Sequence, residues 1–281
     1  MLGIISFMKT YKEDEVEVYS AQAAFFLMLS FIPFIACLTS LLSLTPVSMA
    51  FLEKVILDVL PSYLDDVFDP FFKSNYVDTN VVFSVSVVVG LWTASKGIQN
   101  LTIGLNKIFD VKETRSWLRV RVTSAIYTII MLLNLILSLF VLVLGDHVHR
   151  WLTDAFPAGA YVLEKIASLR MVVVFVVMVV VFDLMYIALP NNNIRKAFKM
   201  NMIRMLPGAV IAAVCWFAIS IAFYVAATYF GGFAFYGSVA TLVMLMFWIC
   251  ACMITFMAGG LINRMYIDWL MKMPRRNVKK N

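Results

Sequence analysis

The chain has 281 residues, of which 62% are hydrophobic and 14% are charged. Soluble domains carry about 25% charged residues, so this composition excludes an ordinary soluble protein. The net charge of +6 is compatible with a nucleic-acid partner, but the basic residues lie beside apolar segments and no basic–aromatic binding module accompanies them. We therefore expect no nucleic-acid partner. We expect the basic residues to set membrane topology and to meet anionic lipid headgroups.

Six apolar runs dominate the chain, and each is long enough to cross a hydrocarbon core of about 30 Å as an α-helix. A helix satisfies its backbone polar groups within the segment, as hydrocarbon requires. The sequence therefore predicts one all-α membrane domain over residues 1–281, a polytopic bundle of six transmembrane helices. The predicted spans are residues 21–44, 81–105, 123–144, 171–189, 206–230 and 236–262.

Three further segments flank these spans. Residues 1–18 predict a cytoplasmic interfacial helix, because acidic residues follow the short apolar start and the pattern of a signal peptide is missing. Residues 45–80 show two short apolar stripes at helical spacing, which predict amphipathic helices in the first external loop. This loop would be a structural cap over the bundle, or else a gate or a surface that meets lipid. Residues 263–281 predict a basic cytoplasmic tail.

Lysine and arginine residues are distributed unevenly between the two sides of the predicted bundle. Most of the 23 lie before the first span, between the second and third, between the fourth and fifth, and after the sixth. Such an excess marks the cytoplasmic side, which predicts that both termini are cytoplasmic. The basic loops at residues 107–121 and 195–204 would gather anionic lipid.

Polar residues cluster on one face of the second predicted span, where hydrocarbon makes them costly. The residues of this face, which lie within about 120° of one another on a helical wheel, are Lys96, Gln99, Asn100, Asn106 and Trp92. The small residues of an adjoining face are Gly90, Ala94, Gly97 and Gly104. Small residues let a neighbouring helix approach closely, so we expect this span to lie at the centre of the bundle.

The fourth span carries a single acid, Asp183, at nearly the same predicted depth as Lys96. An unpaired charge at this depth costs at least about 2.5–3.5 kcal/mol. We therefore expect Lys96 and Asp183 to approach each other, directly or through water and amide side chains. The pair would be either a structural ion pair that fixes helix register or part of a substrate or proton site.

Other polar and small residues are weaker candidates. Gln22 lies on one face of the first span, and Asn134 lies in the middle of the third, where it can cross-link helices by hydrogen bonds. We include both with the polar residues above in a hypothetical substrate path. Gly259 and Gly260 indicate close helix packing near the end of the sixth span.

Recognisable catalytic and cofactor-binding motifs are missing from the sequence. The chain has no P-loop, no Gly-x-Ser-x-Gly elbow and no His-Glu-x-x-His helix, which excludes an ATP-driven pump and argues against an enzyme. His147 and His149 invite interpretation as a metal site, but no third nitrogen or sulfur ligand lies nearby. We therefore expect no metal and no cofactor.

Several short phrases occur in order along the chain. They are Ser20-Ala21-Gln22-Ala23-Ala24-Phe25-Phe26, Trp92-Thr93-Ala94-Ser95-Lys96-Gly97, Tyr186-Ile187-Ala188-Leu189-Pro190-Asn191, Pro207-Gly208-Ala209 and Tyr236-Gly237-Ser238. This ordered set, over roughly residues 10–270, resembles the YihY/BrkB family of bacterial inner-membrane proteins. The resemblance implies a six-helix protein of the cytoplasmic membrane, and family members are regarded as transporters with links to envelope lipids and virulence. Some were once labelled ribonuclease BN, but the nucleolytic pattern His-x-His-x-Asp-His is absent here.

The leading functional hypothesis is a transporter that does not hydrolyse ATP and that moves lipid or another anionic amphiphile. In this hypothesis Lys96 attracts an anionic headgroup, and Asp183 balances its charge when the site is empty. The alternative is a scaffold or partner subunit in envelope assembly, which would bind copies of itself or another envelope protein through the glycine face and the outer helices. A membrane enzyme would need a second carboxylate or a histidine near Asp183, and the sequence pattern shows none.

Overall fold

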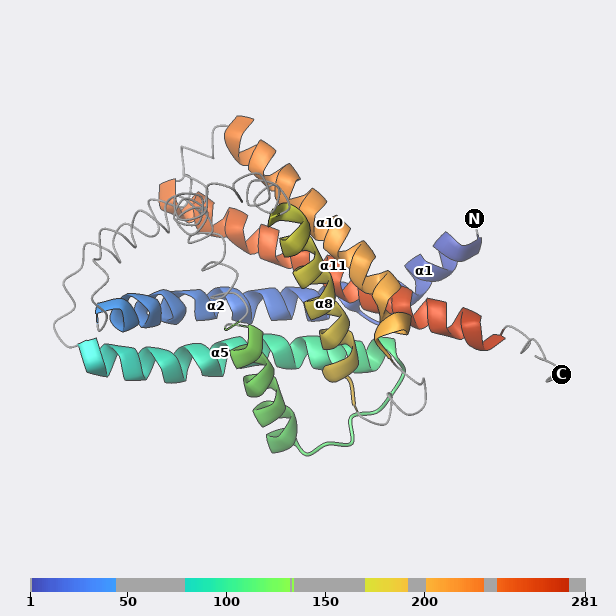
Figure 1. Cartoon of the computed structure of the whole chain (residues 1–281), viewed down its shortest axis with the longest axis horizontal. Helices are drawn as coiled ribbons and strands as arrows, with labels where there is room; N and C mark the ends of the chain where they lie inside the picture. Colours follow the sequence, from blue (N-terminus) through green and yellow to red (C-terminus); the bar gives the residue numbers. More distant parts are fainter. Residues whose placement is uncertain are drawn as a thin grey trace, which may run out of the picture.

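Figure 1 shows the protein as a computed structural model, which describes residues 2–43, 79–131, 133, 170–191, 201–229 and 237–272. Some expectations from the sequence fall outside these ranges. They concern the external loop up to residue 78, Asn134, the two histidines, and the chain from residue 273 onward.

All regular secondary structure in the described ranges is α-helical, which confirms the all-α class. The labelled helices are α1 (Leu2–Glu13), α2 (Val16–Ser43), α5 (Thr79–Ile108), α8 (Arg170–Ala188), α10 (Met202–Tyr229) and α11 (Gly237–Lys272). A further helix without a label covers residues 117–131, and we call it the 117–131 helix. In Figure 1, α2 and α5 lie side by side, and α1 lies at the end of the molecule where α11 finishes.

The first helix is shorter than the predicted interfacial helix over residues 1–18. α1 ends at Glu13, and a turn follows in which Glu15 adopts a positive φ of 53°. α2 begins directly afterwards at Val16, whose side chain is fully buried. Burial of Val16 explains the difference, because it ties residues 16–18 to the long helix that enters the core.

The predicted basic tail also begins later than expected, because α11 continues to Lys272. The extension keeps a buried face, in which Asn263 and Ile267 are both 0% exposed. Arg264 donates hydrogen bonds to the backbone carbonyl of Ile108 at the end of α5 and, at 3.4 Å, to Asp14 in the turn after α1. Arg264, a basic residue of the predicted tail, thus links α11 to the end of α5 and to the turn after α1.

Among the described helices α11 holds the central position, which the sequence predicts for the second span instead. α11 contacts α10, α2, α5 and α1, whereas α5 packs chiefly against α2 and less extensively against α11. Small residues on α11 explain this position: Gly259 meets Gly208 of α10, and Gly260 meets Leu105 of α5. Two helices can approach α11 closely because these glycines carry no side chain.

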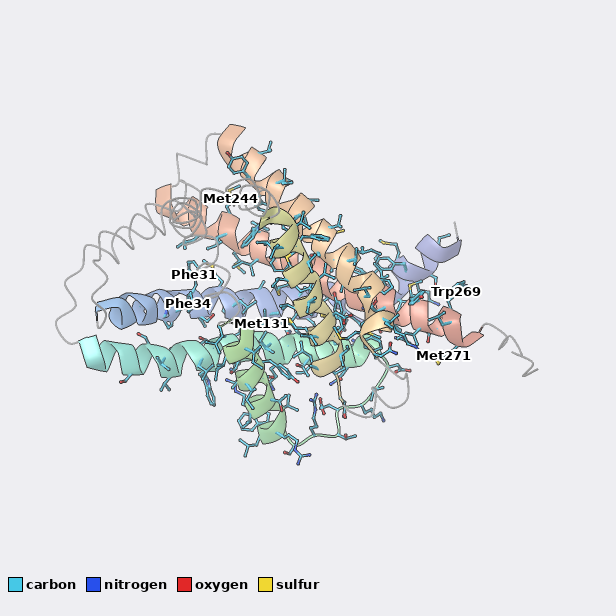
Figure 2. The ribbon with its side chains drawn as sticks, in the orientation of Figure 1. Phe31, Phe34, Met131, Met244, Trp269 and Met271 are labelled. Atoms are coloured by element: carbon cyan, nitrogen blue, oxygen red, sulfur yellow. The ribbon has the colours of Figure 1, made fainter. Side chains whose placement is uncertain are left out.

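Large apolar side chains cover the outside of the molecule, as Figure 2 illustrates for Trp269 and Met271 near the end of α11. Ile203 on α10 is 80% exposed, and Phe247 on α11 is 65% exposed. Soluble monomers rarely expose apolar surface so extensively. Two helical segments, Met202–Ala226 and Leu242–Met271, are long and apolar enough to cross a membrane. The count of six spans and the orientation stay predictions.

Candidate functional site

The glycine face of α5 packs against α2. A Cβ atom added to Gly97 would lie 3.0 Å from Leu27 Cγ and 3.2 Å from the Ala23 carbonyl oxygen. Ala94, which belongs to the same face, is also buried. A Cβ atom added to Gly90 would meet Pro33 of α2. A Cβ atom added to Gly104 would meet Tyr19 of α2 and Met257 of α11. Because these helices already fill the face, it is not an open groove for another protein.

Arg121, on the 117–131 helix, is buried against the polar face of α5, with only 5% of its surface exposed. Its guanidinium donates to the Trp92 backbone carbonyl at 2.7 Å and to Gln99 Oε1 at 3.1 Å. The same group lies 4.2 Å from the centre of the Trp92 ring. Arg121 Nε has no hydrogen-bond partner, and among the described residues no carboxylate forms an ion pair with Arg121. This cation is therefore buried without an opposite charge.

Lys96 lies on the same stripe of α5, four residues after Trp92 and three before Gln99, so Arg121 reaches residues on both sides of it. The Lys96 ammonium lies 5.1 Å from the centre of the Phe26 ring of α2. Such a cation–π contact contributes about 0.5–1 kcal/mol at an exposed site and about 2 kcal/mol when desolvated. The ion pairs found in the described structure do not include Lys96. Two cations thus share one helix face.

Asp183 is 1% exposed, and neither of its carboxyl oxygens has a hydrogen-bond partner. The direct ion pair expected between Asp183 and Lys96 is therefore absent from the described structure. Helix placement explains the error: Lys96 contacts α2 through Phe26, whereas the aromatic residues beside Asp183 on α8 pack against α10 and α11. The sequence indicates the depth of each charge in the bundle, but not the direction in which each helix faces.

The end of α5 is tied to the end of α8 by a polar network, which we call the Glu113 network. Asn106 donates to Glu113 Oε2 at 2.7 Å and accepts the backbone N–H of Asn191 at 2.9 Å. Arg115 binds both carboxylate oxygens of Glu113, at 2.9 and 2.7 Å, and donates to the Leu189 carbonyl. Asn106, which we placed in the substrate path, is therefore 3% exposed and engaged in a cross-link.

The charges and hydrogen bonds of the Glu113 network lower the pKa of Glu113. Partial burial acts to raise the pKa of Glu113, but the hydrogen bonds and charge of Arg115, with a hydrogen bond from Asn106, outweigh burial and lower it. A carboxyl with a lowered pKa stabilises the fold above its ordinary pKa, and this contribution is lost as the pH falls through the folded value. The network is thus built around an ionised glutamate.

A second group of charges holds α1 and α2 to the same end of the bundle. Lys107 on α5 forms an ion pair with Glu15 at 2.5 Å, and the hydrogen bond that Lys107 donates to Glu15 is the main reason that the pKa of Lys107 is raised. Burial raises the pKa of Asp14 despite the opposing charges of Arg264 and Lys107. A cavity of about 310 Å³ lies beside this group, and its lining includes Lys107, Lys112, Asp110 and Glu113. The mixed charges of this lining do not favour an anion.

The remaining predicted site residues lie apart from this arrangement. Gln22 is exposed on the surface of α2 and so points away from the core, and Asn100 is half-buried on α5. Gly259 and Gly260 lie at the crossing of α11 with α10 and α5, where the Tyr186 hydroxyl also donates to the Phe256 carbonyl at 2.6 Å. In the part of the chain that the structure describes, no group of three or more His, Cys, Asp or Glu side chains is placed to hold a metal.

Sequence reasoning missed Arg121, because we counted it among the basic loop residues that set topology. A signal was present, since Arg121, Ser124 and Thr128 follow one another at helical spacing. All three are buried, with exposures of 5%, 1% and 3%. A polar stripe that begins before the predicted start of the third span indicates that the helix begins earlier and turns this stripe inward.

A helical protein whose apolar residues face outward, and whose buried charges lie between apolar helices, belongs to the class of integral membrane proteins. The sequence model of the family described as virulence factor BrkB matches residues 7–278. The chain therefore belongs to the BrkB family, and the resemblance seen in the sequence is confirmed.

One relative in Bacillus subtilis (strain 168) carries the name "Putative ribonuclease-like protein YfkH". The two sequences are 30% identical over 280 residues, which cover 97% of this chain and 99% of the relative. No solved structure matches the chain.

Proposed function

We propose that the protein is a six-span transporter of the bacterial cytoplasmic membrane, with both termini in the cytoplasm, that moves a lipid or another anionic amphiphile without hydrolysing ATP. The observation that carries this proposal is the pair of cations on one face of α5. Arg121 donates to Gln99, which follows Lys96 by three residues on the same face of α5, and neither cation has a carboxylate partner among the described residues. Two cations that share a partly desolvated face repel each other, and a bound anion removes this cost.

The chemistry of the two cations favours a phosphate-bearing headgroup as the anion. Arginine presents a planar fork of donors that matches phosphate oxygens, and lysine supplies a point charge. Trp92, which is 53% exposed, provides an apolar surface beside these donors that suits the start of an acyl chain. The basic loops predicted at residues 107–121 and 195–204 would concentrate anionic lipid.

The rival scaffold hypothesis depends on the glycine face of α5 and on the outer helices; α2 and α11 already fill the glycine face, and the outer helices up to residue 78 lie outside the described residues. A nuclease function is suggested by the name of the Bacillus subtilis relative. We expect the purified protein in nanodiscs to leave a fluorescently labelled RNA intact. RNA cleavage that co-purifies with the protein and disappears in a substituted variant would favour the nuclease instead.

Removal of either cation should slow lipid movement in proteoliposomes. Charge-assisted hydrogen bonds contribute about 1.5–3 kcal/mol, so we expect Lys96→Met and Arg121→Met each to lower the rate by about tenfold or more. The assay follows a fluorescent anionic phospholipid from the inner to the outer leaflet by chemical quenching. Arg121→Lys, which keeps the charge but loses the fork, should fall between wild type and Arg121→Met.

Matched controls are available on the same or nearby helices. Arg119 lies two residues before Arg121 and is exposed, and Lys12 is exposed on α1. Arg119→Met and Lys12→Met remove the same charges from the surface and should lower the rate far less than Lys96→Met or Arg121→Met. Equal rates in wild type, Lys96→Met and Arg121→Met, with all proteins folded, would reject the transport proposal.

A further inference from the structure

Asp183 is a buried acid that the proposed anion site does not use. It lies on α8 about one and a half turns before the end of the helix, it is 1% exposed, and both its oxygens lack hydrogen-bond partners. An ionised carboxylate without partners in a medium of low dielectric is so costly that such groups take up a proton instead. In the conformation described, Asp183 is therefore a neutral acid.

Among the described residues, no group forms a hydrogen bond that would stabilise the charge of Asp183. Tyr186, one turn along α8, interacts electrostatically with Asp183, but its hydroxyl donates to the Phe256 carbonyl at 2.6 Å. The other titratable or charged side chains that the structure describes on the two helices packed against α8 are Arg204, Cys215 and Tyr224 on α10, and Cys250, Cys252, Arg264, Tyr266 and Asp268 on α11. None of them, nor Lys96 or Arg121, forms a hydrogen bond or ion pair with Asp183.

The interface around Asp183 can open only at a cost. Phe182 packs against Trp216 of α10 and Phe256 of α11, with ring centres 5.4 and 5.3 Å apart, and Tyr186 stacks on Phe256 at 4.7 Å. These rings exclude water from the carboxyl. Ionisation of Asp183 therefore requires that α8 move and that water or a counter-ion reach the group.

We propose that Asp183 is a proton-binding site that links the position of α8 to the proton concentration. The closed arrangement binds the proton, and an open arrangement with Asp183 in contact with water releases it to that water. Because the closed state binds more protons, a fall in pH favours closure and a rise in pH favours opening. Each pH unit above the point of titration shifts the ratio of open to closed states by up to about tenfold. This inference goes beyond the movement of an amphiphile and does not depend on which one is carried.

The first test detects the proton directly, in the full chain in lipid nanodiscs at neutral pH. A protonated carboxyl has an infrared carbonyl band that a carboxylate lacks. We expect this band in wild type and its loss in Asp183→Asn, which keeps the shape of the side chain. Asp14→Asn is the matched control, because Asp14 is an acid outside the predicted spans that is paired with Arg264. If the wild-type and Asp183→Asn spectra are identical in this region, Asp183 is ionised and the proposal is overturned.

The second test measures opening by amide hydrogen exchange in α8, compared between wild type and Asp183→Asn at each pH. The chemical exchange rate is nearly equal in the two proteins at one pH, so the ratio of their rates reports opening. We expect a ratio near one at about pH 5, and a rise of about tenfold or more by about pH 9, the range in which buried carboxyls titrate. If the ratio of the two exchange rates does not change with pH, protonation of Asp183 does not control the opening of α8, and the proposal is overturned.

Two further arms keep the result interpretable. Asp183→Leu is a second neutral variant, and it should match Asp183→Asn in exchange and remain folded by size-exclusion chromatography. At high pH, replacement of sodium by choline should leave the wild-type exchange unchanged. If sodium alone controls the exchange of α8, the site binds a metal cation and the proton proposal fails.

Discussion

The Gly208→Ala variant should lose a large part of its folding stability, because its Cβ atom has no space at the crossing of α10 and α11. That atom would overlap the Gly259 carbonyl oxygen and lie 2.5 Å from Asn263 Cγ. The first obstacle is backbone, which cannot turn aside as a flexible side chain can. Separation of the helices would also strain the 2.7 Å hydrogen bond from the Gly208 N–H to Asn263 Oδ1. We expect a loss of about 3 kcal/mol or more, at or above the upper end for overpacked cores.

The measurement is the midpoint of thermal unfolding in detergent, with Gly90→Ala as the matched control. A Cβ atom on Gly90 would lie 3.2 Å from Pro33 Cβ, a contact that small shifts can relieve. The control should therefore lose far less stability than Gly208→Ala. Equal midpoints for the two variants would contradict the close crossing of α10 and α11.

The Glu113→Leu variant should have the second largest effect on stability, because it removes the acceptor at the centre of the Glu113 network. Arg115, whose side chain is 11% exposed, would lose its bidentate partner, and Asn106 would lose its acceptor. Charge-assisted hydrogen bonds contribute about 1.5–3 kcal/mol each. Since the Glu113 side chain is 25% exposed, water replaces part of the loss, and we expect a net cost of about 2–3 kcal/mol.

The same network predicts how stability depends on pH. The pKa of Glu113 is lowered in the folded protein, so its contribution is complete at neutral pH and disappears as the pH falls below about 4. Wild type should therefore lose stability in acid, and Glu113→Leu should lose less over the same range. The double variant Glu113→Leu with Arg115→Leu should recover part of the loss, because it leaves no unpaired guanidinium. If the double variant is as unstable as the sum of the single variants, Arg115 and Glu113 are not coupled.

The fold class and the small-residue contacts were accessible from sequence because both depend on local pattern. Apolar runs identify helices, and a glycine repeat every seven residues places Gly90, Gly97 and Gly104 on one face. The structure sets α2 against that face. The helix ends were less accessible, because Arg264 looks like the start of a basic tail until its contacts with Asp14 and the Ile108 carbonyl are seen.

The candidate site was only partly accessible, because its geometry depends on how the helices are rotated about their own axes. Sequence placed Lys96 and Gln99 on one stripe, but it could not show that Arg121 would lie over that stripe. It identified Asp183 as an unusual acid and then assigned it a partner by depth alone. An opposite charge at the same depth lowers the cost of burial only if the two helices face each other, and here Asp183 is left without a partner.

The most direct test of the central claim, that Lys96 and Arg121 together hold an anionic headgroup, is native mass spectrometry of the protein released from anionic phospholipid. The account predicts that wild type retains a bound anionic lipid, that Arg119→Met retains it equally, and that Lys96→Met with Arg121→Met loses it. Equal retention of anionic lipid by wild type and the double variant would contradict the account.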